Sequence, residues 1–163
     1  MFARMECTEA AEATLLRAAQ AAAPREIAAV LGGCVVGATA QVRRVLMLPN
    51  EAVDDQASFA VDGVAFTQCE HELRRGGDTF LGFAHSHPHG STAPSIRDRE
   101  QLWTECVQVI TDGTTWQAFV LDEHRSAHPL AAMPNTVHQE VHHEVHHEVS
   151  THPVGTNDLE QRS

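Results

Sequence analysis

The feature that most constrains the fold is the segment TFLGFAHSHPHGSTAPSIRD at residues 79–98, where an apolar run ends in two histidines and a proline. The apolar run predicts a buried strand. Alternate side chains of a strand point to the same face, so His85 and His87 project together. The proline then ends the strand, and a short polar loop leads to a helix that starts at Ser95. Asp98 lies in the first turn of that helix, where its carboxylate can face both imidazoles.

Two imidazoles and one carboxylate form a three-ligand zinc set with a fourth position open to water, which is the composition of catalytic zinc sites. Each part also has an ordinary interpretation. A His-x-His pair is often a surface pair, and Ser95-x-x-Asp98 is a capping box found at many helix starts. His89 breaks the strand alternation and is left out of the set. The joint spacing of His85, His87, Ser95 and Asp98 favours the metal site.

The rest of the chain predicts a mixed α/β (α+β) domain whose sheet is largely antiparallel and flanked by helices. The expected helices span Thr8–Ala23, from an Asp62 cap to about Arg75, and Ser95 to about Trp103. The other expected elements are two antiparallel strands within 24–50, a short strand at 59–63, the histidine strand, and a hairpin at 106–122 that turns at Asp-Gly.

The length and the change in composition predict one domain and a tail. A chain of 163 residues is sized for one core, and we assign residues 1–132 to it. Residues 133–163 form a low-complexity tail rich in His, Glu and Val, with valines every four residues from Val137 to Val149. Metal sequestration by the paired histidines is one interpretation. A solvated tail is favoured, because its small apolar surface does not offset the entropy of ordering it.

Charge and cysteine usage limit the compartment and the partners. The net charge of −11, with arginine as the basic residue and no lysine, disfavours binding to nucleic acid or to anionic lipid. We expect no membrane span and no secretion signal. The four scattered cysteines are expected to be reduced thiols (Cys7, Cys34, Cys69 and Cys106). Together these features predict a cytoplasmic protein.

The pattern His85-x-His87-Pro, six residues, then Ser95-x-x-Asp98 resembles the zinc signature of the JAMM (Jab1/MPN/Mov34) metalloprotease family, in its small prokaryotic type. The segment LLRAAQAAAPREIAAVLGG also resembles that family's first helix and strand, and the likeness extends over residues 9–132. The chain departs from the family pattern at Ala28-Ala29, shortly after Glu26, where many members carry Cys-Gly. The resemblance implies a cytidine-deaminase-like MPN domain.

The resemblance also implies how the site works. It implies one zinc ion held by His85, His87 and Asp98, with Glu26 as the general base that takes a proton from water and passes it to the leaving amine. Ser95 would donate its hydroxyl to the developing oxyanion. Without the resemblance, Glu26 ranks little above Glu70 and Glu72 as a candidate base (both lie in the second expected helix).

The implied substrate is a peptide or isopeptide bond after the C-terminal Gly-Gly of a ubiquitin-like or sulfur-carrier protein. Two alternatives stay open, a RadC-like MPN protein and a non-catalytic MPN scaffold. The acidic charge argues against the first, and the complete set of zinc ligands argues against the second. The sequence leaves the oligomeric state, the leaving group and the role of the tail open.

Overall fold

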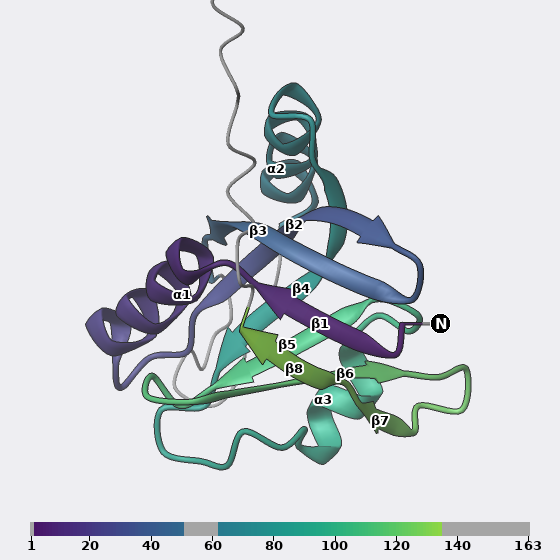
Figure 1. Ribbon diagram of the computed structural model, residues 1–163. Coiled ribbons are helices and arrows are strands. Elements are labelled where there is room, and N and C mark those ends of the chain that lie inside the picture. The colour runs from purple at the N-terminus through teal and green to yellow at the C-terminus, as the bar shows by residue number, and fades with distance from the viewer. Residues whose placement is uncertain (1, 51–61, 135–163) are drawn as a thin grey trace, which may run out of the picture.

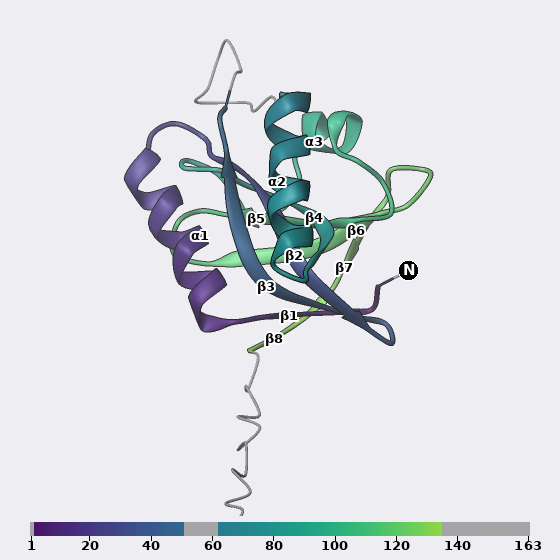
Figure 2. The same ribbon diagram turned by 90° about the horizontal axis from the view of Figure 1, so that it is seen from above.

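The computed structural model describes residues 2–50 and 62–134 of the chain. Within these ranges the chain forms one mixed sheet with helices on both faces (Figures 1 and 2). The helices are α1 (Glu9–Ala22), α2 (Gly63–Arg75) and α3 (Ile96–Gln101). The strands are β1 (Arg4–Cys7), β2 (Ala28–Val36), β3 (Thr39–Leu48), β4 (Thr79–Ser86), β5 (Val107–Thr111), β6 (Trp116–Leu121), β7 (Ala127–Pro129) and β8 (Ala131–Pro134).

The strand order of the described sheet is β7-β6-β5-β4-β2-β3-β1-β8. The antiparallel pairs are β2–β3, β2–β4, β5–β6 and β6–β7, and the parallel pairs are β4–β5, β1–β3 and β1–β8. The predicted mixed sheet, the paired strands β2 and β3, the histidine strand β4 and the hairpin β5–β6 are therefore confirmed. Strands β1, β7 and β8 were not predicted.

Most of the predicted helices are confirmed with their caps. Thr8 caps α1 by accepting a hydrogen bond from the backbone of Ala11, and Asp62 caps α2 in the same manner. The third helix begins at its Ser95 cap as predicted, but it ends at Gln101 instead of near Trp103. The short strand expected at 59–63 lies almost entirely outside the described residues. No helix of the described ranges is long and apolar enough to cross a bilayer.

The two faces of the sheet carry different helices. Leu15 and its neighbours on α1 pack with alternate residues of β2 and β5 on one face. Leu73 of α2 packs on the other face against Val30 and Phe83, and Leu102, just after α3, packs there against Ile110. Figure 2 shows α1 apart from α2 and α3. His85 pairs directly with Ile110, so its side chain belongs to the face covered by α2 and α3.

The described sheet extends slightly beyond the predicted end of the domain at residue 132. Strand β8 reaches Pro134 and pairs with β1 in parallel. The rest of the His-rich tail lies outside the described residues. A truncation that tests the tail should therefore keep the chain up to Pro134, so that β8 remains whole.

Candidate metal centre

The two histidines are positioned by the end of β4. His85 lies within the strand and is fully buried. His87 follows the last strand residue, and its backbone N–H donates to the carbonyl of Thr111 at 2.8 Å. This bond continues the pairing with β5 by one residue beyond the strand. The sheet therefore fixes both imidazoles, two positions apart and on one face.

Asp98 completes a compact group of three possible metal ligands. The Nε2 atoms of His85 and His87 lie 3.1 Å apart. His85 Nε2 is 3.2 Å from Asp98 Oδ1, and His87 Nε2 is 3.2 Å from Asp98 Oδ2. One ligand atom from each residue lies within 4.8 Å of the others. The structure thus brings together the three residues that the sequence pattern selected, in a group suited to hold a metal ion.

The capping box of α3 orients the carboxylate. The backbone N–H of Ser95 donates to Asp98 Oδ2 at 2.7 Å, and the N–H of Asp98 donates to Ser95 Oγ at 3.1 Å. The capping role predicted for Ser95 is therefore confirmed. The side chain of Ser95 also forms a hydrogen bond with Asp98, which contributes to the lowered pKa of that carboxyl.

A backbone carbonyl sets the tautomer of His87. Its Nδ1 lies 2.7 Å from the carbonyl oxygen of Ser91, in the loop that follows the strand. A carbonyl can only accept, so Nδ1 carries a hydrogen, and in the neutral form of the imidazole the lone pair is on Nε2. That lone pair faces His85 and Asp98. Metal-binding histidines commonly have their second nitrogen fixed in this way.

The electrostatics of the group also suit a cation. Burial lowers the pKa of His85 and keeps its imidazole neutral. Burial raises the pKa of Asp98, but the hydrogen bonds to His85 and His87 outweigh it, so the pKa is well below its usual range. The pKa of His87 is raised overall. Burial alone would lower this pKa, but the hydrogen bonds to Asp98 and Ser91 outweigh the effect of burial. Two imidazole nitrogens and an ionised carboxylate are donors that zinc prefers.

The register between β2 and β4 brings Glu26 to the same place. Ala28 pairs with His85 in the antiparallel ladder. The pairing continues past the end of the strand, because Ile27 N–H donates to Ser86 Oγ at 3.0 Å and Ser86 N–H donates to the carbonyl of Ile27 at 3.3 Å. One step further, Glu26 lies opposite His87. Its side chain is largely buried, and its negative charge contributes to the raised pKa of His87.

The other acids and the third histidine considered above have different surroundings. On α2, Glu72 forms an ion pair with Arg44 at 2.6 Å and Glu70 forms a longer one with Arg74 at 3.5 Å. His89 is exposed and does not belong to the three-ligand group. Of the three glutamates considered as the base, Glu26 is the one that the β2–β4 register brings to the histidines.

Three supporting contacts were not predicted from the sequence. They are the carbonyl of Ser91 at His87, the hydroxyl of Ser86 at the backbone of Ile27, and Asn50, whose Nδ2 donates to the carbonyl of Glu26 at 3.0 Å. The strand alternation could have indicated Ser86 as a buried polar residue between the histidines. The other two contacts depend on loop geometry, for which the sequence contains no local signal.

Comparison with known proteins identifies the class. The family described as prokaryotic homologs of the JAB domain matches residues 8–122, which is most of the chain. The chain therefore belongs to this family. The recognition of a JAB/MPN domain from the histidine and Ser-x-x-Asp pattern is confirmed.

Among individual proteins, the chain is similar to a probable TtuB-protein conjugate cleaving protease from Thermus thermophilus, with 35% identity over 85 residues. That match covers 51% of this chain and 56% of the relative, so the chain spans little more than half of the relative's length. A solution structure of a protein from Desulfitobacterium hafniense has a TM-score of 0.74 at 22% identity, over 85% of this chain and 98% of that one. A JAB1/MPN domain protein from Archaeoglobus fulgidus has a TM-score of 0.50 at 20% identity, over 80% and 98% respectively. These two likenesses concern the fold.

Proposed function

We propose that this protein is a zinc-dependent metallopeptidase that hydrolyses the peptide or isopeptide bond after the C-terminal Gly-Gly of a ubiquitin-like or sulfur-carrier protein. The observation that carries the proposal is the convergence of His85, His87 and Asp98, with Glu26 opposite His87 in the strand register. Membership of the JAB family and the name of the Thermus relative support it. The proposed compartment is the cytoplasm, in keeping with four free cysteines.

In this mechanism His85, His87 and Asp98 would hold the metal, and His85 would contribute a neutral imidazole because it is buried. Zinc bound there supplies Lewis-acid polarisation of the scissile carbonyl and acidifies water. The Glu26 carboxylate takes the proton of the attacking water and then delivers it to the departing amine, so that the carboxylate is regenerated. The Ser95 hydroxyl donates to the carbonyl oxygen as negative charge develops on it.

The proposed substrate presents an extended C-terminal tail to the zinc site. An extended C-terminal tail can lie along a sheet as an added strand, with its glycines passing the point nearest the metal. The decisive experiment incubates a small ubiquitin-like carrier bearing extra residues after Gly-Gly with the protein and locates the cut by mass spectrometry. Cleavage after the second glycine is expected, with near-complete loss when that glycine is alanine. Efficient cutting of casein, or indifference to the alanine, would contradict the carrier as substrate.

Two controls separate the alternatives. The complete ligand set favours an enzyme over a scaffold, and a Glu26→Gln protein that binds metal but cleaves as fast as the wild type would contradict the proposed base. The net charge of −11 opposes a RadC-like role on nucleic acid. A protein that binds DNA at physiological salt but cleaves no carrier would favour that alternative instead.

A further inference from the structure

The peptide group that joins Glu26 to Ile27 is hydrogen-bonded at both ends by side chains of other segments. Its carbonyl oxygen accepts from Asn50 Nδ2 at 3.0 Å, and its N–H donates to Ser86 Oγ at 3.0 Å. Asn50 follows β3 and Ser86 ends β4, so the two partners come from the strands on either side of β2. The backbone next to the proposed base is therefore bound from both sides.

On the β3 side, a proline ends the backbone ladder. Ala28 is paired with Leu48, and the residue after Leu48 is Pro49, which has no N–H to donate. The same register, continued by two residues, places Asn50 level with Glu26. The side-chain amide of Asn50 therefore adds a hydrogen bond beyond the point where the ladder stops.

On the β4 side, the hydroxyl of Ser86 serves as an acceptor in the ladder. In a regular antiparallel pair, two opposite residues exchange two N–H···O=C bonds. Here the N–H of Ser86 donates to the carbonyl of Ile27 at 3.3 Å, whereas the N–H of Ile27 donates to the Ser86 hydroxyl. Ser86 is 1% exposed and Ile27 is 7% exposed. Removal of the hydroxyl would therefore take the acceptor from a buried N–H, which is costly.

The Ser86 hydroxyl lies on the face of the sheet opposite to the candidate metal ligands. Ser86 stands between His85 and His87, and neighbouring residues of a strand point to opposite faces. Ile27, which donates to the hydroxyl, packs on that opposite face in the core beneath α1. Ser86 therefore acts on the site through the backbone, as a positioning residue, and does not contact a substrate at the metal centre.

We propose that Ser86 and Asn50 clamp the Glu26–Ile27 peptide group and thereby hold the Glu26 carboxylate in place beside the metal centre. A peptide group is planar, so bonds to its oxygen and to its N–H fix the whole unit and the position of the Glu26 Cα atom. A misplacement of about 1 Å can cost ~10²-fold in rate. This inference rests on the proposed function and adds two positioning residues to it.

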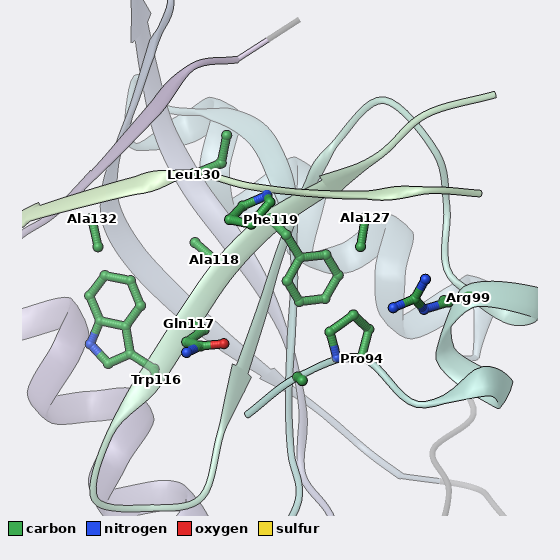
Figure 3. Close-up of a pocket in the computed structure, with 11 residues that line it drawn as sticks. Pro94, Arg99, Trp116, Gln117, Ala118, Phe119, Ala127, Leu130 and Ala132 are labelled. Carbon is green, nitrogen blue, oxygen red and sulfur yellow. The ribbon is translucent and has the colours of Figure 1, made fainter. Parts of the chain in front are cut away.

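The chain offers two controls away from this clamp. Thr79 begins β4 and donates its hydroxyl to the carbonyl of Gly33 at 3.1 Å, so it joins the same two strands at their opposite end. Gln117 is an exposed residue of β6, on the far side of β5 from β4, and lines a cavity of about 370 Å³ (Figure 3). Neither Glu26 nor any of the three candidate metal ligands lines that cavity. Thr79→Ala and Gln117→Ala therefore leave the clamp intact.

The first test measures amide hydrogen exchange of the full chain by NMR and does not depend on catalysis. Ser86→Ala should speed the exchange of the Ile27 N–H by about tenfold or more, because this amide loses its buried acceptor. Ser86→Thr, which keeps a hydroxyl, should retain the protection of Ile27, and the two control variants should change it little. Unchanged exchange of Ile27 in Ser86→Ala would overturn the inference.

The second test measures kcat and KM on the extended carrier, and bound zinc is quantified in each variant. Ser86→Ala should lower kcat by about tenfold to 10²-fold, with KM and zinc content near the wild-type values. In a Glu26→Gln background, Ser86→Ala should cause no further loss, because a residue that acts through the Glu26 carboxylate has nothing left to position. An equal loss in both backgrounds, or a loss of zinc from Ser86→Ala, would overturn the inference.

Asn50→Ala tests the clamp from its other side, at a partly exposed residue, and keeps the inference testable if Ser86→Ala does not fold. It should lower kcat by a similar factor and retain zinc, and an unchanged kcat would contradict the clamp. A wild-type chain that cleaves no carrier, although Ser86 protects the Ile27 amide, would overturn the proposed function and leave the clamped peptide group standing.

Discussion

Substitution of Ser95 separates two roles that one hydroxyl could fill. In the structure Ser95 Oγ accepts the backbone N–H of Asp98 at 3.1 Å, which makes it the N-cap of α3. In the proposed mechanism the same hydroxyl donates to the oxyanion. Alanine removes both functions. Glycine also removes the hydroxyl, but it is a much better N-cap residue than alanine.

The two roles predict different patterns of loss. Ser95→Ala should lower the free energy of unfolding by about 1 kcal/mol, and Ser95→Gly by only a few tenths of a kcal/mol. Loss of an oxyanion donor costs ~10²–10³ in kcat whichever residue replaces it. Both variants should therefore lose that factor while differing in stability. Ser95→Thr, which keeps a hydroxyl and caps helices well, should retain most of both.

The assay pairs urea unfolding with kcat measured on the extended carrier, and bound zinc is quantified in each variant. The backbone N–H of residue 95 still donates to Asp98 in all of them, so zinc content should change little. If Ser95→Gly keeps near-wild-type turnover while Ser95→Ala does not, the hydroxyl acts only as a cap. The reasoning about an oxyanion donor would then be refuted.

Four further predictions follow from other parts of the molecule. Glu26→Gln should retain zinc and lose at least ~10²-fold in kcat, because an amide cannot accept the proton; elemental analysis with turnover checks both. A chain that ends at Pro134 should keep its cooperative unfolding, its activity and about one zinc ion per chain. A chelator should remove this zinc ion, and the activity should be lost with it. A truncated chain that is folded but contains no zinc would contradict the metal centre. Gly82→Ala should destabilise the fold by ~2 kcal/mol or more, because its Cβ would lie 1.8 Å from the carbonyl oxygen of Val107; an unchanged urea midpoint would contradict the close strand contact. Burial raises the pKa of the Cys7 thiol to about 12, so as the pH rises the unfolded chain loses this proton before the folded chain does. The free energy of unfolding should therefore fall as the pH rises from about 9 toward 12. Urea titrations should show a steeper fall with pH for the wild type than for Cys7→Ala.

Much of the fold was predictable because its signals are local. The alanine-rich helix α1 is bounded by a Thr8 cap and by Pro24, and the β5–β6 hairpin turns at Asp112-Gly113. The three metal-ligand candidates were also predictable, because strand alternation and a helix cap fix their relative placement within fourteen residues of sequence (His85 to Asp98).

The missing parts depend on contacts between distant segments. Strand β1 is short and joins β3 and β8 in parallel, so neither a turn nor a neighbouring strand indicates it in the sequence. The position of Glu26 opposite His87 follows from the β2–β4 register, which only the folded sheet determines.

The same register has a consequence for the protein as it is being made. Glu26 precedes β2, the histidines end β4, and Asp98 follows on α3, so the site draws on parts of the chain that are synthesised at different times. Until residues 79–98 have left the ribosome and β4 has paired with β2, a nascent chain contains the proposed base without the candidate metal centre. A shift of the pairing by one residue would turn Glu26 to the opposite face of the sheet. The proposed hydrolytic activity therefore requires the completed tertiary structure, and we expect an unfinished or misfolded copy of this protein to pose no proteolytic risk to its neighbours.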